Sequence, residues 1–152
     1  MREAAFADSP PEARAAYPHF LTIPTRWNDN DSYGHVNNAI YYYYFDTVIN
    51  AFLIKQGGLD IHRGKIIGIT PETACRFLDS FGFPEMVEAG LRVVHLGKSS
   101  VKYQIALFKQ GRETPAALGH FVHVFVTRED NRPAEIPASV RRALETLYVA
   151  TE

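Results

Sequence analysis

The longest apolar pattern in this chain has the spacing of an α-helix and lies between residues 38 and 56. Apolar side chains recur there every three or four positions in two adjoining stripes: Ile40, Tyr44, Val48 and Ala51, and Phe45, Ile49 and Phe52. This period predicts a helix over 38–56, and Gly57 and Gly58 would end it. Because the two stripes nearly merge, we expect the helix to be covered on most sides.

The rest of the chain has mostly the patterns of β-strands. Four strand-like segments follow the helix: 65–78, which is interrupted near Pro71 and forms one or two strands, 86–96, 99–109 and 116–127. Short turn-forming segments that separate the last three indicate hairpins. A further strand is predicted over 20–27, and Pro24 inside it indicates an edge position, since proline cannot donate a hydrogen bond to a neighbouring strand.

Alternation within two of these strands predicts which side chains share a face. In the segment 99–109 the apolar alternate positions are Val101, Tyr103, Ile105 and Leu107. In the segment 116–127 the corresponding set on or near one face is Leu118, Val122, Val124 and Val126. Residues 137–150 then have the apolar spacing of a short amphipathic helix.

This order of elements predicts one α+β domain over residues 18–150. The simplest packing places the long helix across an antiparallel sheet that curls around it, with the short helix at the C-terminal end. Residues 1–17 contain Pro10 and Pro11 and are predicted to form a loosely ordered arm. Because the helix covers only one sheet face and at least one sheet edge stays open, we expect the protein to be at least a dimer.

The composition limits which binding partners and which cellular compartment can be expected for this protein. The 152 residues are 46% hydrophobic and 22% charged, with a formal net charge of −1. This balance gives no general attraction to nucleic acid, and no apolar segment approaches the roughly 20 residues that a membrane-spanning helix needs. Cys75 is the only cysteine, so neither an intrachain disulfide nor a sulfur-rich metal site is expected. We therefore expect a cytoplasmic protein.

The candidate chemistry lies in a polar turn over 28–36, directly before the long helix. Asp29 and Asp31 are two residues apart, and Gly34 would let the backbone approach a ligand. A carboxylate beside a helix start can attack a carbonyl group or activate a water molecule to do so, while free N–H groups stabilise the oxyanion. The two carboxylates could also raise each other's proton affinity, or both could be ionised and solvated.

Two asparagines mark the start of this helix. Asn37 is expected to cap the helix by accepting a hydrogen bond from a backbone N–H. A capped helix start still has other free N–H groups that can bind a thioester or ester oxygen. His35 could act as an acid–base group or could hold the shape of the turn, and the sequence leaves both roles open.

Other reactive side chains have simpler interpretations. His120 and His123 are three residues apart in a strand, so they point to opposite faces and are not expected to share a metal. Cys75 is expected to be a buried, unreactive thiol. Most of the tyrosines at 41–44 are expected to pack in the core or at an interface. The motifs of nucleophile-elbow hydrolases, P-loop proteins and Rossmann dinucleotide sites are absent from the sequence.

Residues 26–45 contain the pattern D-x-D-x-x-G-H-V-N-N-x-x-Y, which resembles the acyl-CoA thioesterases of the hot-dog fold. Among these enzymes, the chain resembles the 4-hydroxybenzoyl-CoA thioesterase-like family, and this similarity extends over about residues 18–148. It implies a hot-dog fold, an α+β arrangement whose sheets continue across a homodimer, and dimers that often form homotetramers. The sequence His-Val-Asn-Asn after the glycine resembles a broader acyl-CoA branch, so a hydroxybenzoyl substrate is not implied.

The resemblance also assigns roles within the site. The catalytic aspartate corresponds to Asp31, the N–H that polarises the thioester carbonyl to Asn38, and His35 is a further candidate. Substrate-binding candidates are Tyr33, Gly34, Asn37, Tyr41, and, from a second subunit, Gly97, Lys98 and Ser99. For the coenzyme A phosphates, the candidates are Lys98, Arg63 and Arg128. No metal or separate cofactor is implied, because coenzyme A is part of the acyl-CoA substrate.

Two other functions fit the same resemblance. A hot-dog hydratase or dehydratase uses an aspartate and a histidine, but the spacing between Asp31 and His35 is shorter than in the hydratase motif, and the proline of that motif is absent. A non-catalytic protein that binds acyl thioesters is the alternative from a different class. Release of free thiol from an acyl-CoA separates the hydrolase from both.

Overall fold

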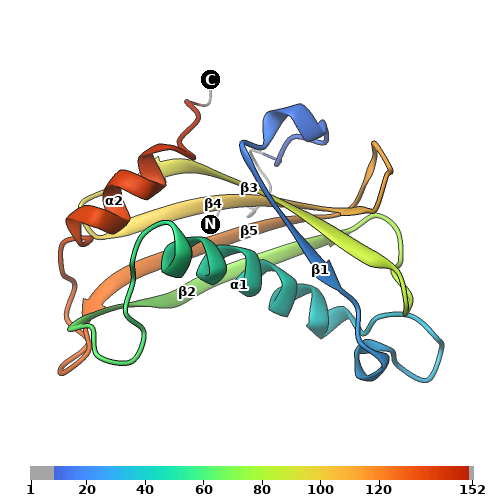
Figure 1. Cartoon of the computed structure of the whole chain (residues 1–152), viewed down its shortest axis with the longest axis horizontal. Helices are drawn as coiled ribbons and strands as arrows, with labels where there is room; N and C mark the ends of the chain where they lie inside the picture. The colour runs from blue at the N-terminus through green and yellow to red at the C-terminus, as the bar shows by residue number, and fades with distance from the viewer. Residues whose placement is uncertain (1–8, 151–152) are drawn as a thin grey trace, which may run out of the picture.

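A single antiparallel sheet of five strands forms the framework of the protein in the computed structural model, which describes residues 9–150 (Figure 1). The strands are β1 (His19–Pro24), β2 (Ile66–Phe77), β3 (Met86–Leu96), β4 (Ser100–Lys109) and β5 (Pro115–Thr127). They lie in the order β1-β3-β4-β5-β2. β1 and β2 therefore form the two edges, which confirms the edge position that Pro24 predicts.

The long helix α1 (Asn38–Lys55) lies along one face of the sheet, and the short helix α2 (Ala138–Glu145) lies near the end of that sheet (Figure 1). The predicted α+β hot-dog arrangement is confirmed. α1 ends one residue before its predicted end, whereas α2 is shorter than the predicted 137–150. β1 ends at Pro24 instead of Trp27, because Trp27–Asp29 forms a short 3-10 helix, η2.

The core lies between α1 and the inner face of the sheet. Seven helix residues are buried: Tyr41, Tyr44, Phe45, Val48, Ile49, Phe52 and Leu53. Helix and sheet approach each other closely at Gly119 in β5, where an added Cβ would lie 2.6 Å from Cζ of Phe45. Only glycine leaves room for the Phe45 ring there, so this contact determines how near α1 lies to the sheet.

The outer face of the sheet is partly covered by the chain that precedes β1. Tyr17 is buried against Ala106, Phe108 and Leu118, and Arg14 forms an ion pair of 2.6 Å with Glu88. The predicted arm covers residues 1–17, of which residues 1–8 lie outside the described part of the chain. None of the helices within residues 9–150 is long and apolar enough to cross a bilayer.

The free edge of the sheet is long and partly apolar. β2 has 12 residues and pairs only with β5, with an irregularity between Ile69 and Glu72 beside Pro71. Ile69 and Phe77 in this strand are 40% and 42% exposed. Tyr43 of α1, which lines a hollow together with Phe121 of β5, is 64% exposed. A long edge of this kind is a template for pairing with another strand.

Candidate functional site

The turn between β1 and α1 is held in place by Asp29, which is 1% exposed. Its carboxylate accepts hydrogen bonds from the Arg26 backbone N–H at 2.8 Å, the Arg26 Nε at 3.0 Å and the Tyr44 hydroxyl at 2.8 Å. Its backbone oxygen accepts from the Asn37 N–H at 2.8 Å. Asp29 therefore joins the turn to the first part of α1.

These contacts also determine the ionisation of Asp29. Burial would raise the pKa of its carboxyl group, but the hydrogen bonds from the Arg26 backbone and the Tyr44 hydroxyl, with the Arg26 guanidinium, outweigh burial and lower the pKa below its usual value. Asp29 is therefore an ionised structural residue. Asp29 differs from both states that the sequence leaves open for the paired carboxylates. It is buried and hydrogen-bonded, so it is not solvated, and its lowered pKa opposes a raised proton affinity.

Asp31 has a different environment, since it is only half-buried. Its Oδ1 accepts a hydrogen bond from the Tyr33 N–H at 2.9 Å, and its backbone N–H donates to the His35 oxygen at 2.8 Å. Gly34 has φ of 81°, a conformation that favours glycine and closes the turn. Among the described residues, no donor bonds Oδ2 of Asp31, so this oxygen is available to a ligand or a water molecule.

A hollow of about 360 Å³ lies beside Asp31. Ten residues line this hollow, which we call the Asp31 hollow: Asp31, Tyr33, His35, Val36, Asn38, Tyr41, Phe77, Leu78, Asp79 and Ser80. It brings the candidate carboxylate, the candidate oxyanion donor and the exposed His35 to one cavity. Gly34 and Asn37 belong to the same turn, although they do not line the cavity.

The start of α1 presents a free donor to this hollow. The Asn37 side chain accepts a hydrogen bond from the Ala39 N–H at 2.9 Å, so Asn37 is the predicted helix cap. The Asn38 backbone N–H has no acceptor within residues 9–150. A carbonyl oxygen in the Asp31 hollow can therefore accept a hydrogen bond from Asn38 without displacing an existing contact.

The end of β2 supplies lining residues that the sequence did not reveal. Phe77, Leu78, Asp79 and Ser80 reach the hollow because the Tyr41 hydroxyl accepts a hydrogen bond from the Phe81 N–H at 3.2 Å and holds this segment beside α1. The Ser80 N–H, and then Lys109, lower the pKa of the Asp79 carboxyl group. Asp79 is thus a second carboxylate in the cavity, and its lowered pKa favours the ionised form.

Gly97, Lys98 and Ser99 lie elsewhere in the chain. They form the turn between β3 and β4, beside α2 (Figure 1). Arg141 donates to the Gly97 oxygen at 2.6 Å, and the Lys98 oxygen accepts from the Ile136 N–H at 3.0 Å. The predicted role of Gly97, Lys98 and Ser99 in the site of a second subunit requires two assembled chains, and it stays a prediction.

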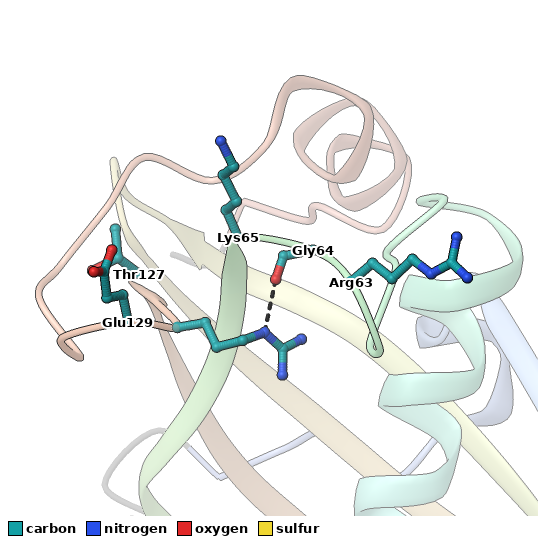
Figure 2. A pocket seen from close by; sticks show the side chains of 6 residues that line it. Arg63, Gly64, Lys65, Thr127 and Glu129 are labelled. Carbon is teal, nitrogen blue, oxygen red and sulfur yellow. Dashed lines mark hydrogen bonds between the residues drawn. The ribbon is translucent and has the colours of Figure 1, made fainter.

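Arg63 and Arg128, two of the candidates for binding phosphates, line a second hollow of about 330 Å³. Its walls also include Gly64, Lys65, Thr127 and Glu129 (Figure 2). Arg128 Nε donates to the Gly64 oxygen at 2.9 Å. Lys98, the third phosphate candidate, does not line this hollow and instead forms an exposed ion pair with Glu135 at 3.6 Å.

Two further histidines and the single cysteine have structural environments. His123 is buried and its Nδ1 lies 3.1 Å from the Tyr103 hydroxyl, and burial lowers its pKa to about 4. His120 instead contacts Glu72 at 2.8 Å on the opposite face. Burial raises the pKa of the half-buried Cys75 thiol to about 12. Within residues 9–150, no three His, Cys, Asp or Glu side chains are grouped closely enough to bind a metal ion.

Comparison with known proteins relates this geometry to a family. The sequence pattern of the Thioesterase-like superfamily matches residues 25–144. The chain is similar to the PA5185 protein from Pseudomonas aeruginosa strain PAO1, with a TM-score of 0.91 and 48% identity over 94% of this chain and 100% of that chain. No protein with a curated description matches the chain.

Two other solved structures are similar to this fold. Gentisyl-coenzyme A thioesterase BH1999 has a TM-score of 0.73 and 26% identity, with 83% of this chain and 99% of that chain covered. The protein SAV2348 from Staphylococcus aureus, solved in complex with CoA, has a TM-score of 0.77 and 16% identity, with 88% of this chain and 87% of that chain covered. At that identity, the likeness to SAV2348 concerns the fold alone.

Proposed function

Because the chain belongs to the Thioesterase-like superfamily, we propose that it is an acyl-CoA thioesterase, which hydrolyses an acyl-CoA to a free carboxylic acid and coenzyme A. The observation that carries this proposal is that the half-buried Asp31 carboxylate and the unpaired Asn38 N–H line one hollow. A carboxylate and an oxyanion donor on one cavity are what thioester hydrolysis requires.

In the proposed reaction the thioester carbonyl accepts a hydrogen bond from the Asn38 N–H. This donor stabilises the negative charge that develops on the oxygen when the carbonyl carbon is attacked. The thiolate of coenzyme A then leaves with the electrons of the C–S bond. Since a thiol has a pKa of about 8.5, its thiolate is a good leaving group, and no general acid is needed for this step.

Asp31 supplies the attacking group in one of two ways. As a general base, its carboxylate takes a proton from a water molecule while the water oxygen attacks the carbonyl carbon. As a nucleophile, it attacks directly and forms a mixed anhydride that water then hydrolyses. We favour the water route slightly. His35 holds the turn through its backbone oxygen, which accepts the Asp31 N–H at 2.8 Å.

The proposed substrate range is short-to-medium or broad. One of the similar solved structures is described as a gentisyl-coenzyme A thioesterase, so aryl thioesters belong in the test as well. Tyr33, 85% exposed at the rim of the hollow, and the buried Tyr41 would contact the acyl group. Coenzyme A would enter as part of the substrate, with no further cofactor.

We expect purified protein to release free thiol from at least one member of a panel of short, medium, long and aryl acyl-CoAs. A thiol-reactive dye measures this release, and the preferred substrate should give kcat/KM of about 10⁴ M⁻¹ s⁻¹ or higher. No thiol release across the panel would contradict a thioesterase. Binding of acyl-CoA without turnover would then indicate a binding protein. If an enoyl-CoA tested beside the panel loses its double bond without thiol release, the protein would be a hydratase.

We further propose that the protein works as a homodimer in which two copies pair through β2, or as a homotetramer of such dimers. β2 is the free edge with exposed Ile69 and Phe77. Pairing two such strands in antiparallel orientation about a two-fold axis would join the sheets and bury this edge. It would also cover the exposed flank of α1 at Tyr43.

Light scattering after size exclusion should therefore give twice or four times the chain mass of 17.1 kDa. Specific activity should fall when the protein is diluted until the subunits separate. A monomer that keeps full specific activity at every concentration would be incompatible with a site that needs two subunits.

A further inference from the structure

Two aromatic rings, those of Tyr41 and Phe77, form one wall of the Asp31 hollow. Both residues line the hollow, and their ring centroids lie 4.9 Å apart with an angle of 76° between the ring planes. This edge-to-face arrangement brings the two rings into direct contact. Tyr41 is 2% exposed and belongs to the main core, whereas Phe77 is 42% exposed. The pair therefore stands between the hollow and the core.

Hydrogen bonds hold both sides of this wall. The Tyr41 hydroxyl accepts from the Phe81 N–H at 3.2 Å, so the phenol ring cannot turn away without leaving a buried donor unpaired. The residue after Phe77 is fixed as well, because the Leu78 N–H donates to the Ala116 oxygen at 2.8 Å. The contact between the two rings is therefore a fixed feature of the hollow.

Cys75 lies behind the wall, two residues before Phe77 in β2. Alternate residues of a strand share a face, and Cys75 is opposite Gly119 of β5, which contacts the Phe45 ring of α1. Both Cys75 and Phe77 therefore point toward α1. Burial raises the pKa of the Tyr41 hydroxyl, and the nearby Cys75 adds to this rise. A path between the two rings would lead to the half-buried Cys75 thiol, which packs against the main core.

The position of the candidate oxyanion donor gives the direction of the acyl group. Asn38 is the first residue of α1, and Tyr41 follows three residues later, about 4.5 Å further along the helix axis. Coenzyme A is large and charged, so it needs the open side of the hollow, where Tyr33 is 85% exposed. An acyl group whose carbonyl oxygen is bound at Asn38 then extends toward Tyr41 and Phe77.

We propose that Phe77 determines acyl length by closing the hollow against Tyr41, so that short-chain or single-ring aryl thioesters are hydrolysed and longer alkyl chains are excluded. This inference rests on the proposed thioesterase function and narrows its substrate range. Each methylene group that a pocket cannot accommodate costs roughly 10- to 200-fold in kcat/KM. Phe77 acts on specificity alone, since its ring has no group that could exchange a proton with the substrate.

The dependence of kcat/KM on acyl length tests the wall directly. For the unaltered protein, kcat/KM should be at least about tenfold lower with octanoyl-CoA than with butanoyl-CoA. Phe77→Ala should raise the octanoyl-to-butanoyl ratio of kcat/KM about tenfold or more, and Phe77→Leu should raise it less. Equal or faster hydrolysis of octanoyl-CoA by the unaltered protein, or an unchanged ratio in Phe77→Ala, would overturn the proposal.

Ile69→Ala is the matched control. Ile69 is another apolar residue of β2, 40% exposed, and it does not line the Asp31 hollow. Both substitutions remove apolar surface from the same free edge, so a weaker contact between subunits would affect both variants, and light scattering measures it. Ile69→Ala should keep the unaltered octanoyl-to-butanoyl ratio. An equal shift of the ratio in both variants would contradict a wall at Phe77.

Labelling of Cys75 tests the wall without turnover, and Cys75 is the only cysteine of the chain. An aromatic disulfide reagent should label Cys75 about tenfold faster or more in Phe77→Ala, because the thiol is then open to the hollow. In Phe77→Ala/Asp31→Asn, which should not hydrolyse thioesters, octanoyl-CoA should slow this labelling and butanoyl-CoA should not. Unchanged labelling in Phe77→Ala, or equal protection by the two thioesters, would contradict the proposal.

The same experiments separate the two levels of inference. Failure of the proposed function would appear as no thiol release from any acyl-CoA by the unaltered protein. Failure of the role of Phe77 would appear as thiol release with the same dependence on acyl length in Phe77→Ala and in the unaltered protein.

Discussion

Replacing Asp31 by Asn should lower kcat/KM for the preferred acyl-CoA by about 10²–10⁴. The amide cannot take a proton from water and is a poor nucleophile, so either proposed route loses its attacking group. The fold should be retained, because an asparagine oxygen can still accept the Tyr33 N–H that Asp31 now accepts at 2.9 Å. Initial rates of thiol release, with thermal unfolding measured in parallel, give both quantities.

A comparison within the same cavity makes this test specific. Asp79 also lines the Asp31 hollow, but the Ser80 N–H donates to its Oδ1 at 2.8 Å and Lys109 lies 3.5 Å from its Oδ2. Asp79→Asn should therefore lower kcat/KM by less than about tenfold, the loss expected from a weakened contact and not from a missing base. A larger loss in Asp79→Asn than in Asp31→Asn would reverse the assignment of the catalytic carboxylate.

Replacing Asp29 by Ala should destabilise the fold by roughly 2–4 kcal/mol. The substitution leaves the Tyr44 hydroxyl without its acceptor at 2.8 Å and removes the acceptor of the Arg26 N–H. Because the turn also positions Asp31, catalytic activity should fall together with stability. Urea unfolding at a fixed protein concentration measures the free energy, and Tyr44→Phe, which removes only the hydroxyl, should cost about 1 kcal/mol.

The effect of Asp29 should depend on pH in a defined direction. Its pKa in the folded protein lies below the unfolded value of about 3.9, so ionisation stabilises the folded state above that value. This contribution is lost as the pH falls through the lowered folded pKa. The difference in unfolding free energy between the unaltered protein and Asp29→Ala should therefore shrink in acid. A difference that stays constant down to the acid-unfolding region would show that ionised Asp29 does not stabilise the fold.

Periodicity predicted the main elements because each repeats over many residues. The helix over 38–56 differs from α1 by one residue, and Val101, Tyr103, Ile105 and Leu107 all lie buried in the core, as one shared face requires. In β5, the face with Val122, Val124 and Val126 does not contact the main core. The opposite face, with Phe121 and Phe125, does so, because the aromatic rings fill the space beneath α1. Alternation assigns residues to faces but does not identify the covered face.

The candidate site was predicted only where its residues are close in sequence. Asp31, His35, Asn38 and Tyr41 lie within one turn and the start of one helix, so local pattern placed them together. Phe77 and Asp79 reach the same cavity through contacts between residues about forty positions apart, such as the 3.2 Å bond from Phe81 N–H to the Tyr41 hydroxyl. Nor did spacing reveal that Asp29 is buried and Asp31 is not, since that difference depends on Arg26 and Tyr44.

Because glycine has no side chain, the close contact of Gly119 with Phe45 limits how the sequence of this protein can change. Phe45, whose ring occupies that space, comes seven residues after Asn38, which is about two helical turns. The distance between the N-terminal end of α1 and the sheet is therefore set by the contact of Phe45 with Gly119, which lies away from the Asp31 hollow. As long as Gly119 is kept, we expect substitutions at Tyr33 or Leu78 to change the shape of the Asp31 hollow while the Asn38 N–H stays in place.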